Sequence, residues 1–184
     1  MRHAWRLWGG EIPEEKVNSM VNFAKTLPVQ DAKTFGNNEG DKATPSLRKS
    51  KVRWIHNTEV KDFLWSYVQA ANVEAFGLDL QNFSEVQFTE YHATDNGHYD
   101  WHHDVDWSGE RACDRKLSLV VQLSDPSEYE GGDFQFKTVQ TPGEDFKRRG
   151  SVLVFPSYFE HRVTPVTHGR RYSLVAWFYG PRWR

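Results

Sequence analysis

Hydrophobic and polar residues follow two different periods along the chain, one before residue 85 and one after it. In the first part, apolar residues recur every three or four positions within 13–28 and again within 57–77, which is typical of amphipathic helices. Pro13 suits the first turn of the earlier segment, and Gly77 suits the exit of the later one. The sequence therefore predicts two helices in the N-terminal part.

From residue 85 onward, short apolar runs are separated by Gly, Pro and Asp. The runs read EVQFTEYH, LSLVVQL, GGDFQF, SVLVFP, HRVTPV and YSLVAWFY. Short strands at such close spacing favour a sandwich or barrel over alternating βαβ units. With two helices in front of them, they predict a mainly β fold, best described as a small jelly roll with the N-terminal helices packed outside.

The two predicted helices are separated by a polar, glycine-bearing stretch at 29–51. A loop of this length inside a compact domain is more often functional or mobile than a plain connector. We interpret it as a lid over a site, with surface disorder as the alternative. The 184 residues suit a single domain over 1–184, with a helical support and lid region at 1–84 and the jelly-roll core at 85–180.

Charge and composition narrow the classes of partner. The formal net charge is -2 and no long run of Lys or Arg occurs, which argues against nucleic-acid binding and against a polybasic membrane anchor. The N-terminal stretch lacks the apolar core of a signal peptide, and no stretch is long enough to span a bilayer. The single cysteine, Cys113, allows no intramolecular disulfide and fits a reducing compartment. We therefore expect a cytoplasmic protein.

The stretch GHYDWHHDVDW at 97–107 concentrates imidazole and carboxylate side chains, as a metal site does. On a regular strand, residues two apart share a face. That period places His103 on one face, and it places on the other His98, Asp100, His102, Asp104 and Asp106. Two His-x-Asp pairs pass this filter, one beginning at His98 and one at His102. Periodicity does not choose between them.

A third ligand and a substrate anchor follow further along the chain. His161 lies on a separate predicted strand, which is how a third ligand reaches a site in a β-barrel. Two His and one carboxylate with open positions form the non-haem iron(II) oxygenase arrangement, although catalytic zinc uses the same ligand types. In HGRRYSLVAWF, Arg171 and Ser173 share one strand face, and the arginine fork suits a carboxylate substrate near the metal. An arginine placed to bind a carboxylate substrate favours iron over zinc. The alternative for Arg171 is a surface position on an edge strand.

Joined motifs over about half the chain, from 85 to 178, resemble the iron(II)- and 2-oxoglutarate-dependent dioxygenases, in the prolyl-4-hydroxylase-like branch. The motifs are EYHATDNGHYDWHHD with its two tyrosines and His-x-Asp run, LSLVVQLSDPSEYEGGDFQF with its Gly-Gly step, and GSVLVFPSYFEHRVTPVTHGRRYSLVAWF with its distal histidine and basic residue. In the family's run, the second tyrosine stands three residues before the ligating histidine, a spacing that Tyr99 and His102 fit. The resemblance thereby selects the second His-x-Asp pair over the first.

The resemblance implies a double-stranded β-helix, one form of jelly roll, and it implies roles for individual residues. The implied iron ligands are His102, Asp104 and His161. Arg171 matches the residue that binds the C5 carboxylate of 2-oxoglutarate, and the implied neighbours in the co-substrate pocket are Tyr91, Tyr99 and Ser173. On a regular strand Tyr99 would face away from His102, so its match requires a local bend.

The implied cofactors are Fe(II), 2-oxoglutarate as co-substrate and O₂, with ascorbate as a further candidate. The first hypothesis for the activity is hydroxylation of prolyl residues in a peptide or protein, with release of succinate and CO₂. The same chemistry on a free amino acid or small metabolite is the alternative, and a non-enzymatic jelly-roll binding module is the alternative from another class. The candidate residues for substrate contact are Trp101, Arg53 and Trp54.

Overall fold

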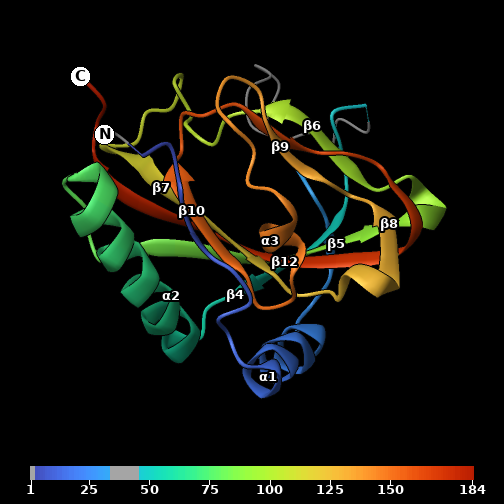
Figure 1. The fold of residues 1–184 in the computed structure, drawn as a ribbon. Coiled ribbons are helices and arrows are strands. Elements are labelled where there is room, and N and C mark those ends of the chain that lie inside the picture. Colours follow the sequence, from blue (N-terminus) through green and yellow to red (C-terminus); the bar gives the residue numbers. More distant parts are fainter. Residues whose placement is uncertain (1–2, 34–45) are drawn as a thin grey trace.

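The computed structural model describes residues 3–33 and 46–184. In this part of the chain two antiparallel sheets face each other, a large one with eight strands and a small one with four. Figure 1 shows helices α1 (Glu14–Lys25) and α2 (Thr58–Ala71) beneath the large sheet and strands of the small sheet above it. The predicted mainly β architecture with N-terminal helices outside is therefore confirmed.

The large sheet has its longest strand in the middle. Its order from edge to edge is β1 (Arg6–Trp8), β10 (Val152–Pro156), β7 (Cys113–Gln122), β12 (Val166–Pro181), β5 (Ser84–His92), β4 (Lys51–Ile55) and β2 (Gln30–Asp31). β8 (Tyr129–Gly131) pairs with the first part of β12, off this path. Because β12 pairs with both β5 and β7, the side chains on its inner face lie at the centre of the sheet.

The small sheet covers the inner face of the large one. Its order is β3 (Arg48–Lys49), β6 (His98–His102), β11 (His161–Val163) and β9 (Phe134–Phe136). Since β4 begins directly after β3 and Ser50, the chain passes here from the small sheet to the large one. The first half of the chain thus supplies strands to both sheets, in addition to the helices expected there. Most of the predicted lid, at 34–45, lies outside the described residues.

The two long helices lie within the predicted segments, and α1 ends at Lys25, three residues before Pro28. Pro13 occupies the N-cap position of α1 without a side-chain hydrogen bond. At the start of α2, the side chain of Asn57 accepts a hydrogen bond from the backbone N–H of Val60. A π-helical turn, η1 (Asn72–Phe76), prolongs α2 and ends at Gly77, which has a left-handed backbone conformation. Three short elements complete the fold, namely η2 (Ala93–Asp95), η3 (Pro126–Glu128) and α3 (Glu144–Lys147).

Two apolar clusters hold these layers together. The first lies between the helices and the outer face of the large sheet and includes Val17, Leu64 and Leu119. The second lies between the two sheets and includes Val120 and Phe134. Leu119 and Val120 belong to different clusters because successive side chains of a strand point to opposite faces. In the described part of the chain, no helix is both long and apolar enough to cross a membrane.

Gly169 turns β12 from its pairing with β8 toward its pairing with β5. Its φ is +66°, and a Cβ added there would lie 1.9 Å from the carbonyl oxygen of Glu128. We expect Gly169→Ala to lower the free energy of unfolding by roughly 2 kcal/mol or more, because it combines left-handed backbone strain with a backbone clash. Urea denaturation measures this.

Gly77→Ala is the matched control, since Gly77 has a φ of +62° but nothing lies within 4 Å of an added Cβ. It should cost only the backbone strain, about 1 kcal/mol. Equal losses in the two variants would show that the close approach of Glu128 does not matter.

Candidate metal centre

Two histidines and one aspartate meet between the sheets. His102 ends β6, His161 begins β11, and the two are register partners in the small sheet. Asp104 lies two residues beyond β6, where its backbone N–H donates to the carbonyl oxygen of Ser157 at 2.8 Å. Strand pairing therefore sets the distance between the imidazoles, and one backbone hydrogen bond brings the carboxylate beside them.

The three side chains have the geometry of a metal site. Nε2 of His102 lies 3.7 Å from Oδ1 of Asp104, and Nε2 of His161 lies 3.6 Å from Oδ2. One ligand atom from each residue falls within 4.8 Å of the other two. Because a metal with ligand bonds of about 2 Å brings its donor atoms to such separations, these three atoms can converge on one ion.

Both imidazoles are held with Nε2 toward the centre. Nδ1 of His102 pairs with the carbonyl oxygen of Asp100 at 2.7 Å, and Nδ1 of His161 pairs with that of Phe159 at 2.9 Å. A carbonyl oxygen only accepts, so Nδ1 is the nitrogen that carries a proton in each ring. This leaves an Nε2 lone pair on each ring free to bind a metal.

The charge states also suit metal binding. Burial, followed by the neighbouring His161, holds the pKa of His102 well below its ordinary value, so the ring is neutral at physiological pH. Burial alone raises the pKa of Asp104, but His161, His102, Arg115 and the Ser118 hydrogen bond outweigh it and the pKa is lowered. The centre therefore offers a neutral imidazole at His102 and an ionised carboxylate at Asp104.

A β-bulge in β6 sets which residues of the 97–107 stretch face the centre. The register between β6 and β11 shifts, since His161 pairs with His102 and Val163 pairs with Tyr99. As a result the ring of Tyr99 stacks on that of His102, with centroids 3.3 Å apart. This is the local bend that the match of Tyr99 requires.

The same bulge corrects the period-two expectation for the start of the stretch. Asp100 does not share the face of His102: its side chain is 52% exposed and lies 4.0 Å from Arg162. His98 turns to the carbonyl oxygens of Asn96 and Ser46. His103 packs its ring edge-on against Trp107, 6.0 Å away, outside the group of possible ligands.

Arg171 lies on the inner face of β12, deep in the cavity that the three ligands line. It is 2% exposed, and its Nη1 has no hydrogen-bond partner among the described residues. A Cβ added to Gly132 would lie 2.9 Å from Cδ of Arg171, so a glycine is needed where the guanidinium stem passes. A buried cation with an unused N–H fork is arranged for an anionic ligand.

Tyrosines and a serine surround this cation. Tyr91, the register partner of Arg171 on β5, has its ring 5.7 Å from the guanidinium carbon. Ser173 is buried and lines the same cavity. Burial raises the pKa of Tyr91, and it raises that of Tyr99 to about 12, so both phenols keep their protons and can donate hydrogen bonds.

The three predicted substrate contacts lie in different places. Trp54 lines a second cavity of about 240 Å³ that shares Tyr99 with the first. Trp101 instead packs under the Arg162 guanidinium, 4.5 Å from its ring centroid. Arg53 lines neither of these two cavities.

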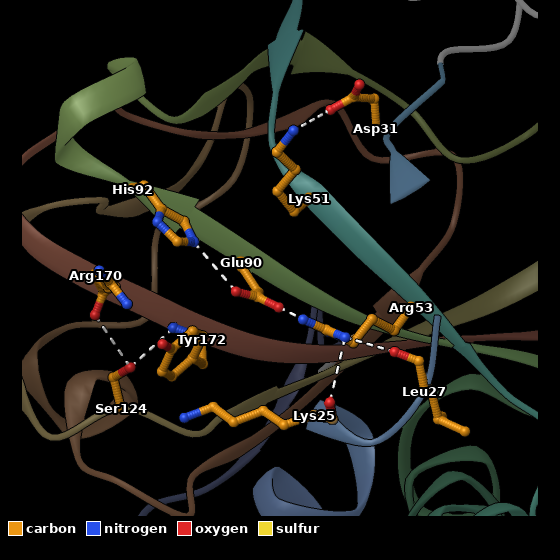
Figure 2. Close-up of polar contacts among 10 residues, drawn as sticks. All are labelled: Lys25, Leu27, Asp31, Lys51, Arg53, Glu90, His92, Ser124, Arg170 and Tyr172. Atoms are coloured by element: carbon orange, nitrogen blue, oxygen red, sulfur yellow. Dashed lines mark hydrogen bonds and ion pairs between the residues drawn. The ribbon is translucent and has the colours of Figure 1, made fainter. Parts of the chain in front are cut away.

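Figure 2 shows Arg53 at the junction of β4, β5 and the end of α1. Its Nε donates to Glu90 at 2.8 Å, and its Nη1 donates to the carbonyl oxygens of Lys25 and Leu27. Glu90 also pairs with His92 at 3.1 Å. These bonds hold the C-terminal end of α1 against the sheet rather than presenting Arg53 to the metal centre.

Besides Tyr99, three residues line both cavities, namely Arg48, Gln87 and Trp177. Trp177 lines both, and it follows Arg171 at the period-two spacing of one strand face, so the strand pattern could have indicated it. Arg48 also lines both, with its guanidinium carbon 4.4 Å from the Tyr99 ring centroid and Nη2 donating to Gln87 at 2.7 Å. Arg48 lies in the polar stretch at 29–51, in which no pattern of residues indicates that the chain crosses from one sheet to the other.

Comparison with known families shows to which of them the chain belongs. The sequence model of the 2OG-Fe(II) oxygenase superfamily matches residues 86–179, about half of the chain. The chain belongs to this superfamily. The matched region contains all three metal-ligand candidates and Arg171. In sequence the oxygenase is similar to PKHD-type hydroxylases, and in fold it is similar to prolyl hydroxylases.

Curated relatives are similar over shorter stretches. A PKHD-type hydroxylase of Synechococcus sp. (strain CC9605) is 43% identical over 83 residues, which is 43% of this chain and 35% of the relative. A PKHD-type hydroxylase of Hyphomonas neptunium is 41% identical over 61 residues, 33% of this chain and 27% of the relative. The matched part of the chain thus spans about a third of the length of these relatives.

Solved structures extend the likeness of the fold to nearly the whole chain. A Pseudomonas putida prolyl-4-hydroxylase superimposes with a TM-score of 0.73 at 20% identity, over 98% of this chain and 94% of that one. A Trichoplax adhaerens prolyl hydroxylase in complex with a hypoxia-inducible-factor peptide fragment gives 0.70 at 15% identity, over 96% and 84%. The oxygenase jelly-roll fold is therefore confirmed.

The residues present fit the iron and 2-oxoglutarate that the family name implies. Two imidazole nitrogens and a carboxylate, with the rest of the cavity beside them, match the ligand set of non-haem Fe(II) oxygenases. The unpaired Nη1 of buried Arg171 fits the distant carboxylate of a dicarboxylic acid.

Proposed function

We propose that this protein is an Fe(II)- and 2-oxoglutarate-dependent dioxygenase that hydroxylates prolyl residues of a peptide or protein and releases succinate and CO₂. One observation carries the proposal: a His-Asp-His cluster and a buried arginine with an unused N–H line one small cavity. The first group suits a redox-active metal, and the second suits a carboxylate co-substrate beside it. Location in the cytoplasm and use of ascorbate stay predictions.

Each residue of the cavity has a separate task in this proposal. His102, Asp104 and His161 hold the iron and leave its other face open. Arg171 anchors the C5 carboxylate of 2-oxoglutarate, and Tyr91 and Tyr99 wall the pocket. When bound, iron and co-substrate would supply the chemistry by which one oxygen atom of O₂ converts a C–H bond to C–OH while the other enters the 2-oxo acid, which becomes succinate and CO₂. The chain's contribution is to orient these groups and to exclude water.

The residues that line the second cavity favour an extended peptide as the substrate. Trp177, which borders both cavities, is 5% exposed, and its Nε1 has no hydrogen-bond partner in the described part of the chain. An indole N–H can only donate, so it suits a peptide carbonyl oxygen. The ring of Trp54, centred 6.2 Å from that of Trp177, adds an aromatic surface of the kind on which proline-rich segments pack.

Names of the similar proteins support this substrate class. The neighbours include prolyl hydroxylases, and one of them is in complex with a peptide fragment. A free amino acid or small metabolite remains the alternative substrate, because the cavity next to the metal centre is small. The non-enzymatic binding module is disfavoured, since all three metal-ligand candidates lie together.

A single assay distinguishes these functions. The protein is incubated with Fe(II), 2-oxoglutarate and O₂, with and without ascorbate, and offered a proline-rich peptide, the same peptide with alanine for proline, or free proline. We expect succinate formation to rise only with the proline-rich peptide, which should gain the mass of one oxygen atom. Stimulation by free proline alone would identify a small-metabolite enzyme. Peptide binding without succinate would identify a binding module.

A further inference from the structure

Two buried serines hold the Asp104 carboxylate from the side of the large sheet. Ser118, on the inner face of β7, donates its hydroxyl to Oδ2 of Asp104 at 2.6 Å. Its oxygen also lies 2.9 Å from the hydroxyl oxygen of Ser157, which directly follows β10. Both serines are 0% exposed. They form a chain of hydroxyls that ends on one carboxylate oxygen.

The hydrogens of this chain can be assigned. Ser118 has a single hydroxyl hydrogen, and the ionised carboxylate can only accept it. The contact between the two serines must then use the hydroxyl hydrogen of Ser157, so Ser157 donates to Ser118. A donor that itself accepts a hydrogen bond is a stronger donor, which reinforces the bond to Oδ2.

Neither serine is free to turn away. Ser118 pairs with Phe155 of β10 on one side and with Trp177 of β12 on the other, in the middle of the large sheet. The backbone of Ser157 accepts from the N–H of Asp104 at 2.8 Å and donates to the carbonyl oxygen of Lys116 at 3.0 Å. The two hydroxyls and the carboxylate are therefore placed by backbone hydrogen bonds, and their mutual distances do not depend on mobile side chains.

The number of carboxylate oxygens used by the metal decides how many positions remain open. Both oxygens of Asp104 face the centre, Oδ1 toward His102 and Oδ2 toward His161. A carboxylate that binds through both oxygens takes up one more position on the ion. If 2-oxoglutarate chelates the metal through two atoms, that extra bond fills the position that O₂ needs.

We propose that Ser118, oriented by Ser157, is a positioning residue that reserves Oδ2 of Asp104, so that Asp104 binds the metal through Oδ1 alone. This inference rests on the proposed function. It assigns the two serines to the binding of O₂: they keep one position on the metal open after the co-substrate has bound. Neither serine is among the residues that line the cavity.

The experiment uses nitric oxide as a probe of the open position, because its complex with Fe(II) has a distinct electron paramagnetic resonance signal. Wild-type protein and Ser118→Ala are saturated with Fe(II), and nitric oxide is added with and without 2-oxoglutarate. With 2-oxoglutarate present, we expect the signal of Ser118→Ala to fall roughly fivefold or more below wild type, since a hydrogen bond to a charged oxygen is lost. Without 2-oxoglutarate the two signals should be equal.

Three variants complete the test. Ser118→Thr keeps the hydroxyl and should restore the signal, whereas Ser157→Ala keeps Ser118 and should reduce it less. Ser151→Ala is the matched control: Ser151 is also 0% exposed and makes two hydrogen bonds, to Gly10 and Asp145, away from the metal centre. It should leave the signal unchanged.

The outcomes separate this inference from the proposed function. An undiminished signal in Ser118→Ala with 2-oxoglutarate overturns the role of Ser118, and so does an equal loss with and without 2-oxoglutarate. A wild-type protein that gives no signal with Fe(II) overturns the proposed function and this inference with it. A loss confined to the samples with 2-oxoglutarate supports both.

Discussion

His161→Ala is expected to abolish the Fe(II)-dependent conversion of 2-oxoglutarate to succinate. Removing one imidazole leaves the ion with two protein ligands, and the loss should exceed the roughly hundredfold effect typical of changes to the groups behind metal ligands. Asp104→Asn and His102→Ala should behave alike, since the three ligand atoms lie within 4.8 Å of one another. Succinate formation and bound iron per chain are the measurements.

His103→Ala is the control, because it removes an imidazole next in sequence to a ligand. The His103 ring packs on Trp107 and is not part of the cluster, so this variant should keep most of its activity and its iron. The thermal stability of each metal-free variant shows whether a loss arises from unfolding. An inactive His103→Ala together with an active His102→Ala would refute the ligand assignment.

Arg171→Met is expected to raise the 2-oxoglutarate concentration needed for half-maximal turnover by about a hundredfold, since truncating a buried charged partner typically costs several kcal/mol. Iron affinity should hardly change, because Arg171 does not belong to the ligand cluster. The dependence of succinate formation on 2-oxoglutarate, beside a titration with metal alone, measures both quantities.

Arg171→Met should weaken co-substrate binding without lowering the stability of the protein. In the metal-free protein, Arg171 is a buried cation with an unpaired Nη1, and replacing such a group with an apolar side chain of similar length is often neutral or stabilising. Arg171→Met should therefore melt at the wild-type temperature or higher, but 2-oxoglutarate with metal should no longer raise that temperature. A variant that lost iron affinity alone would show that Arg171 has another role.

The elements that the sequence predicted are those with a strong period. The helix at 13–28 and the strands from residue 85 onward have enough alternating apolar positions to identify them, and the structure confirms them. The short strands β1, β2 and β3 were not predicted. They have two or three residues each, too few for a period to show, and they form because longer strands are available to pair with.

At the candidate site, the residue types were predictable and their orientations were not. A bare period of two places Tyr99 and His102 on opposite faces, and only the bulge in β6 brings their rings together. A bulge depends on the partner strand, so it leaves no pattern within β6 itself. Ser118 was missed for a related reason: it belongs to an apolar run in which nothing distinguishes an inward position near the ion from any other core position.

The origin of the ligands links the metal centre to the two-layer architecture. His102 and His161 belong to the small sheet, whereas Asp104 is bound by Ser118 and Ser157 from the large one. An ion bound by all three would cross-link the layers through coordination bonds, in a protein that has a single cysteine and no intramolecular disulfide. The distance between the two sheets would then help to determine the affinity for the metal. A substitution among the apolar residues between the sheets, far from any ligand, would change the distances between the three ligand atoms. It would thereby change the relative affinities for different divalent metals.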